Sequence, residues 1–94
     1  MNTNCEVLHI YKTSFGDVIE LGFLNEVVLK PGMYLRDIHN HSWKITGVAM
    51  NNTDVLLKQQ NNKKLHSIWD CQIESLEGSQ ILIGDKLFLF EFKD

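Results

Sequence analysis

Apolar and polar residues alternate with a period of two along most of this chain, which is the pattern of β-strands that turn one face toward a core. The segment 18–24 is the clearest case, because Ile19, Leu21 and Phe23 fall on one side of an extended chain. We expect these three side chains in the interior. The strands predicted in this way are 6–13, 18–24, 27–30, 33–38, 43–50, 55–58, 65–76 with a kink near Asp70, 81–83 and 87–92.

The alternation also assigns faces within each predicted strand. In the segment 6–13 it groups Leu8 with Ile10 and puts His9 on the other face, where we expect a half-buried side chain. Large aromatic residues supply much of the core of so short a chain. The aromatic residues that we expect in the core or at its ends are Trp43, Trp69, Phe88, Phe90 and Phe92.

Short strands with a turn signal every 8 to 12 residues, and no apolar helical stripe of ten or more, predict an all-β fold. Pro31-Gly32 suits a type II turn, in which glycine takes the positive φ. Ninety-four residues make one domain, with a core over about 6–92. We favour a small closed barrel of six to seven strands, rich in antiparallel pairs, because closure removes exposed strand edges.

The charge balance restricts the partners. Nine basic and twelve acidic residues give a net charge of −3, which disfavours a nucleic-acid binder because such proteins normally need a basic face. Lys58, Lys63 and Lys64 form the main local group of basic residues, which we interpret as a solvated loop.

No segment approaches the ~20 apolar residues of a membrane helix, and no export signal opens the sequence. We therefore expect a cytoplasmic protein with Cys5 and Cys71 as reduced thiols.

Turn glycines beside apolar runs occur in an order that is similar to a known barrel family. The segments that carry the similarity are Gly16–Gly22, Leu29–Leu35, Trp43–Met50, Ser75–Gly78 and Ile81–Asp85. In this order they resemble the second domain of elongation factor Tu and related translational GTPases, over nearly the whole chain. The resemblance implies a compact six-stranded β-barrel. In the full factors that domain helps to hold the aminoacyl end of transfer RNA.

Three departures limit what the resemblance implies. Met33 stands where the family usually has aspartate, and 58–67 lacks the family's alanine-glycine-aspartate pattern. The chain also has no phosphate-binding loop motif, so no GTPase activity is carried over. No residue matches a transfer-RNA contact of the family, and that role is not transferred.

His39 and His41 form a His-x-His pair in a predicted turn. On a strand such a pair points the same way and can grip a metal, with a third ligand from Asp37, His66 or Cys71. The spacing fits no established zinc pattern, so we expect two solvated turn histidines, with no metal or other cofactor.

Catalytic groups are not indicated elsewhere. Cys71 follows Asp70, a neighbour that raises a thiol pKa, and we expect a buried structural thiol. The carboxylates are scattered and give no evident acid–base pair. We therefore predict that the protein is not an enzyme.

These observations lead to a non-catalytic binding barrel. Our first hypothesis is a protein-interaction module, either an inhibitor similar to an immunity protein or an accessory subunit, whose acidic surface suits a basic partner. The alternative is an RNA- or ribosome-associated barrel, which requires a cluster of basic residues beside exposed Tyr or Trp. The candidate contact residues are His39, His41, Trp43, Lys58, Lys63 and Lys64.

Overall fold

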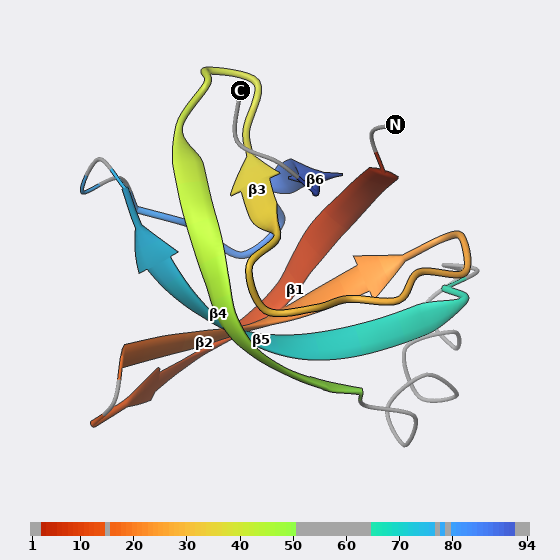
Figure 1. Cartoon of the computed structure of the whole chain (residues 1–94), viewed down its shortest axis with the longest axis horizontal. Helices are drawn as coiled ribbons and strands as arrows, with labels where there is room; N and C mark the ends of the chain where they lie inside the picture. Colours follow the sequence, from red (N-terminus) through yellow and green to blue (C-terminus); the bar gives the residue numbers. More distant parts are fainter. Residues whose placement is uncertain (1–2, 15, 51–64, 77, 79, 92–94) are drawn as a thin grey trace.

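The chain folds into a closed barrel of six antiparallel strands in a computed structural model, which describes residues 3–14, 16–50, 65–76, 78 and 80–91 (Figure 1). The order around the barrel is β1-β2-β5-β4-β3-β6, and β6 pairs again with β1. This confirms the predicted all-β, closed, antiparallel fold. The strands are β1 (Thr3–Thr13), β2 (Gly16–Phe23), β3 (Tyr34–Arg36), β4 (Ser42–Met50), β5 (Ser67–Ser75) and β6 (Lys86–Phe90).

Three of the predicted strands differ from the structure. The segments 27–30 and 81–83 belong to connections, and 65–76 holds the single strand β5 with no break at Asp70. Short apolar runs in connections resemble strands because they too bury alternate side chains against the core. The predicted strand 55–58 lies outside the described residues.

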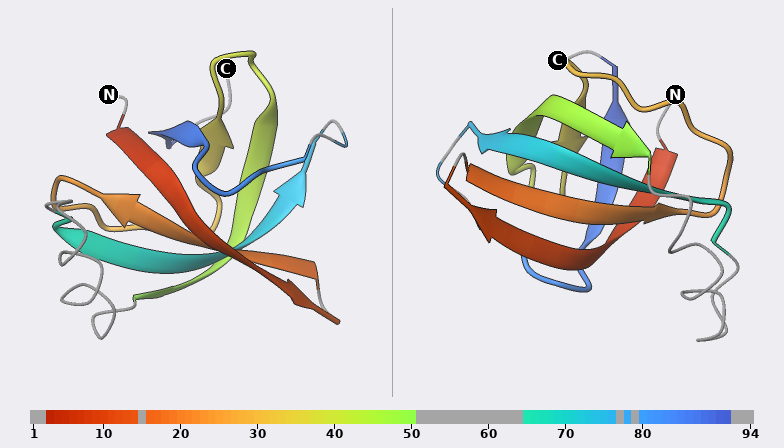
Figure 2. Two further views of the ribbon diagram at one scale, coloured as in Figure 1. Left: turned by 180° about the vertical axis from the view of Figure 1, so that it is seen from behind. Right: turned by 90° about the horizontal axis from the view of Figure 1, so that it is seen from below.

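The core lies where the period-two pattern of β2 puts it. Ile19, Leu21 and Phe23 are buried in the interior, as predicted. Trp43 of β4 is also buried, and Trp69 of β5 packs against the same cluster. Figure 2 shows β1, β2, β5 and β4 side by side in one wall, with β3 and β6 opposite.

A β-bulge changes the inner face of β1. The register with β2 shifts between Val7 and His9, so an extra residue enters the strand there. Before the bulge, Cys5 and Val7 point inward; after it, Ile10 packs against the core. His9 is exposed, which corrects the prediction of a half-buried side chain. Strict alternation fails in this strand because the bulge shifts its phase by one residue.

The predicted inner face of the last strand is wrong. Leu87 and Leu89 of β6 are buried in the core, whereas Phe88 and Phe90 lie on the outside and are half-buried. The pairing decides the phase, because Leu89 is opposite the inward Leu35 of β3. Both faces of this strand are apolar, so the alternation alone does not say which face turns inward. Phe92 lies outside the described residues.

Long connections close the two ends of the barrel. At one end, the β2–β3 connection packs Leu29 and Met33 against the core, and Ile45 donates its N–H to the carbonyl of Met33 at 2.8 Å. At the other end, the β5–β6 connection inserts Ile81, which is 6% exposed. This second end also holds the β1–β2 and β3–β4 turns, and we call it the turn end.

Candidate functional site

Three exposed aliphatic side chains lie at the turn end, while Leu24 and Val28, each 66% exposed, lie in the β2–β3 connection at the other end. Ile38 in the β3–β4 turn is 73% exposed, and Leu82 and Ile83 in the β5–β6 connection are 57% and 61% exposed. Strands β3 and β6 are paired, so the turn that leaves β3 and the connection that enters β6 lie at the same end of adjacent strands. We call the surface made by residues 37–41 and 82–85 the turn face. Large apolar side chains held in water are typical of interaction surfaces when they cluster.

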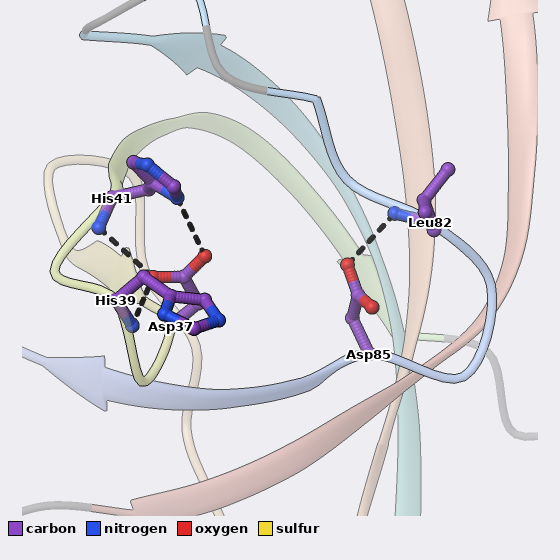
Figure 3. Close-up of polar contacts among 5 residues, drawn as sticks. All are labelled: Asp37, His39, His41, Leu82 and Asp85. Atoms are coloured by element: carbon purple, nitrogen blue, oxygen red, sulfur yellow. Dashed lines mark hydrogen bonds and ion pairs between the residues drawn. The ribbon is translucent and has the colours of Figure 1, made fainter.

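One carboxylate fixes the β3–β4 turn. Asp37 Oδ1 accepts the backbone N–H of His39 at 2.8 Å and of His41 at 2.9 Å, and His41 Nδ1 donates to Oδ2 at 2.9 Å (Figure 3). The backbone adds two bonds, one of them from the N–H of Asp37 to the carbonyl of His41 at 3.1 Å. Asn40 takes the positive φ of 68° that closes the turn, a conformation that asparagine tolerates better than most residues. The turn therefore presents Ile38 on a fixed backbone.

These hydrogen bonds also set the ionisation of Asp37. Partial burial raises the pKa of its carboxyl group, but the hydrogen bonds from the His41 side chain and from the backbone of His41 and His39 outweigh burial. The pKa of Asp37 is therefore lowered from its ordinary value. The carboxylate is ionised, and its bonds in the turn are charge-assisted.

The neighbouring connection is held in the same way. Asp85 Oδ2 accepts the backbone N–H of Leu82 at 2.9 Å, and the Asp85 N–H donates to the Leu82 carbonyl at 3.1 Å (Figure 3). Val7 of β1 then bonds to both Gly84 and Asp85 through its backbone, at 2.8 and 2.9 Å. Leu82 and Ile83 thus stand on a loop that is tied to the barrel wall.

The structure places the predicted contact residues at different depths. His39 and His41 lie on the turn face, with their ring centres 6.1 Å apart. Trp43 lies below them, 6.4 Å from the His41 ring and only 1% exposed, so it supports this surface from the interior. Lys58, Lys63 and Lys64 lie outside the described residues.

Sequence reasoning missed the three exposed aliphatic residues of the turn face. The signal was present, because Ile38, Leu82 and Ile83 are apolar residues beside turn-forming Asp and Gly. Period-two alternation predicts strands over these residues, and an apolar residue in a strand is expected to be buried.

The histidine pair does not extend to a metal centre in the described part of the chain. Across those residues, no group of three or more His, Cys, Asp or Glu side chains is placed to hold a metal ion. Cys71, one of the third ligands considered, points into the barrel interior. The contacts of His41 instead fit a structural role, in which its ring and its backbone both bond to Asp37.

A second surface lies on the outer wall, where β3 and β6 pair. Tyr34 is directly opposite Phe90, and Arg36 is opposite Phe88. Lys44 of β4 follows Tyr34 in the same row. We call these five residues the aromatic strip. The alternation of the last strand does not reveal this surface, because it predicts both phenylalanines in the core.

Comparisons with known proteins found no match among protein-family models, curated proteins or solved structures. Within the described residues, no helix is long and apolar enough to cross a membrane.

Proposed function

We propose that this barrel is a non-catalytic binding module that docks a protein partner on its turn face. The observation that carries the proposal is the presence of three exposed aliphatic side chains, Ile38, Leu82 and Ile83, on two turns that Asp37 and Asp85 hold in place.

Rigid turns favour binding for a thermodynamic reason. Association loses affinity to the ordering of loops and side chains, and a surface that is already ordered avoids part of that loss. Burial of exposed aliphatic area then contributes a favourable free energy of about 25 cal/mol for each Å² removed from water when the partner binds. A preorganised apolar surface is therefore better suited to docking than a mobile loop of the same composition.

The overall charge supports a partner of opposite sign. The net charge of −3 favours encounter with a basic protein through electrostatic steering. An inhibitor of a basic cytoplasmic enzyme, similar to an immunity protein, or an accessory subunit of a larger assembly fits this description.

The test compares variants at the two ends of the barrel. Purified wild-type protein, the double variant Ile38→Ser/Leu82→Ser and the control Val28→Ser are immobilised, and each captures proteins from a lysate of the native cells. Val28 is a matched control because it is 66% exposed but lies in the β2–β3 connection at the opposite end.

The expected result is one stoichiometric partner that the wild type and Val28→Ser retain. The double variant should bind that purified partner at least about tenfold more weakly, which corresponds to ~1.4 kcal/mol. Equal retention by the double variant, or equal loss with Val28→Ser, contradicts docking at the turn face.

The aromatic strip favours a second candidate function, RNA binding. Single-stranded RNA stacks bases on exposed aromatic rings, and cationic side chains contact the phosphates. Tyr34 and Phe88 provide half-exposed rings, while Lys44 and Arg36, whose guanidinium stacks on the Phe90 ring, provide the charge. The resemblance to the second domain of elongation factor Tu supports this alternative, because that domain helps to hold transfer RNA in the full factors.

Salt dependence tests the RNA alternative. Fluorescence anisotropy with a labelled single-stranded RNA should show binding that weakens steeply as salt rises, and Tyr34→Ala should reduce the affinity more than Tyr11→Ala. Tyr11 is a suitable control because it is an exposed tyrosine on β1, away from the strip. Equal effects of the two substitutions, or no binding at low salt, contradict this role.

A further inference from the structure

The second half of β1 forms an edge of the sheet. Up to Glu6, β1 pairs with β6, and Val7 still bonds to the backbone of the β5–β6 connection. The bulge after Val7 bends the strand, and residues 9–13 then pair with β2 alone among the described strands. Figure 2 shows this half of β1 as the outermost strand of its wall, beside β2. We call residues 9–13 the edge segment.

Alternate residues of the edge segment direct their backbone groups away from β2. Val7 turns its N–H and C=O to that side, and the extra residue of the bulge shifts the alternation by one, to Ile10 and Lys12. The hairpin loop gives the same phase, because its closing pair, Thr13 with Gly16, is hydrogen-bonded across the hairpin. Among the described residues, no backbone bond from a turn or connection reaches Ile10 or Lys12. Outward backbone groups of this kind are a template for another extended chain.

Space for an added strand lies directly beside the edge segment. A depression that is open to solvent has Ile10 and Lys12 on one side and Gly78 and Gln80 of the β5–β6 connection on the other. A paired strand lies about 4.8 Å from its neighbour, which places it in this depression. Such a strand bonds to exposed backbone groups and does not need to reach the buried side chains of the barrel. In Figure 1 the end of the hairpin also projects away from the other strands.

The side chains of the edge segment are compatible with a second copy of the same segment. A lysine on a strand edge often prevents pairing, but Asp17 of β2 neutralises Lys12 in an ion pair at 2.9 Å. Tyr11 is 43% exposed, and its ring contacts the ring of His9. Because aromatic pairs across neighbouring strands are favourable, two Tyr11 side chains brought together would bury ring surface that one copy exposes.

We propose that the edge segment pairs with the same segment of a second copy of this chain, in an antiparallel two-fold dimer centred on Tyr11. In this register Ile10 is opposite Lys12 of the second copy, so that their outward backbone groups exchange hydrogen bonds. A register centred on Lys12 would instead place two like charges opposite each other, which is unfavourable. The contact uses the same surface on both copies, so the assembly closes as a dimer. It does not depend on docking at the turn face, because the residues differ.

Sedimentation equilibrium of the purified chain tests the self-association. One strand pair makes a small interface, so we expect a reversible monomer–dimer equilibrium with a Kd in the micromolar to millimolar range. Tyr11→Lys places two like charges at the centre of the pairing and should raise the Kd at least about tenfold. Val28→Lys is the control, because it makes the same change in charge at a residue that is 66% exposed at the other end of the barrel. Its Kd should equal that of the wild type, and circular dichroism verifies that both variants are folded.

Disulfide cross-linking tests the register. Opposite residues of a pair without hydrogen bonds have Cα atoms about 4.5 Å apart, a distance that a disulfide spans. Tyr11→Cys should therefore form a covalent dimer with copper–phenanthroline as oxidant, because residue 11 is opposite itself. Thr13→Cys is the matched control: it is exposed on the same segment, but its two copies lie about 13 Å apart in this register. Thr13→Cys should cross-link only when it is mixed with His9→Cys, the position opposite to it.

Three results would overturn the proposal. A wild type that stays monomeric at millimolar concentration would leave the edge segment to an extended stretch of another protein. A dimer with the same Kd in Tyr11→Lys, or cross-linking of Thr13→Cys alone as fast as that of Tyr11→Cys, would exclude the register. The double variant Ile38→Ser/Leu82→Ser should dimerise like the wild type. Loss of the dimer in that variant would assign self-association to the turn face instead.

Discussion

The guanidinium of Arg36 lies 4.9 Å from the centre of the Phe90 ring, on the outer wall of the barrel. This stacking is a cation–π contact between a residue of β3 and one of β6, diagonal to the direct pair of Arg36 with Phe88. It keeps the ring of Phe90 against the wall and half-buried, while the preceding Leu89 fills the interior. In β6, Leu89 therefore packs in the core, whereas the adjacent Phe90 packs on the outer wall.

Substitutions in β6 test this assignment of faces. Leu89→Ala should destabilise the fold by about 2–5 kcal/mol, because it leaves a cavity in a packed core. Phe90→Ala should cost about 1 kcal/mol, because it removes a half-buried ring and a cation–π contact without opening the interior. Urea unfolding measures both values. A larger loss for Phe90→Ala than for Leu89→Ala would contradict the observed phase of the strand.

The sequence predicts which face of a strand turns inward when only one of its two faces is consistently apolar. In β2, Ile19, Leu21 and Phe23 alternate with polar or small residues on most of the other face, and the inner face follows directly. In β6 both faces are apolar, so the inner face depends on pairing with β1 and β3, which no local pattern contains. The bulge after Val7 is likewise set by tertiary contacts, through the backbone bonds to Gly84 and Asp85.

The sites are less predictable than the fold. The turn with His39 and His41 is visible in the sequence, but the carboxylate that organises it is not, since Asp37 reads as a strand residue. The aromatic strip and the edge segment depend on which strands become neighbours. Tyr34 and Phe90 are 56 positions apart along the chain, yet they face each other across β3 and β6.

The turn between β2 and β3 should depend on Gly32. Its φ of 97° is in the left-handed region, as predicted for the glycine of a type II turn, and Met33 donates its N–H to the Lys30 carbonyl at 3.3 Å. Gly32→Ala should cost about 1–2 kcal/mol from backbone strain, although a Cβ would meet no atom within 4 Å. Thermal unfolding measures the change. Pro31→Ala is the control, with an expected loss of about 0.5 kcal/mol.

The two thiols should be inert in the folded protein. Burial raises the pKa of Cys5 to about 12. Burial also raises the pKa of Cys71, and Cys5 and Asp70 add to this effect. The thiolate is the reactive form, so neither residue should react with Ellman's reagent at pH 8 without denaturant. Both should react in 8 M urea. Rapid labelling of one thiol in native buffer would contradict its burial.

The hydrogen bonds of Asp37 should make the stability of the fold depend on pH in the acidic range. Asp37→Asn should destabilise the fold by about 1–2 kcal/mol at neutral pH, because it removes charge-assisted hydrogen bonds to His41 and His39. The folded pKa of Asp37 is lower than its ordinary value of 3.8, so the stabilisation is complete above that value. It is lost as the pH falls through the folded pKa.

Urea unfolding at pH 6 and pH 2.5 should therefore show a gap in the free energy of unfolding between wild type and variant that becomes smaller at the lower pH. Asp17→Asn is the control, since its ion pair with Lys12 is exposed and should contribute little at either pH. A gap for Asp37→Asn that is the same at both pH values would show that the charge of the carboxylate does not hold the turn.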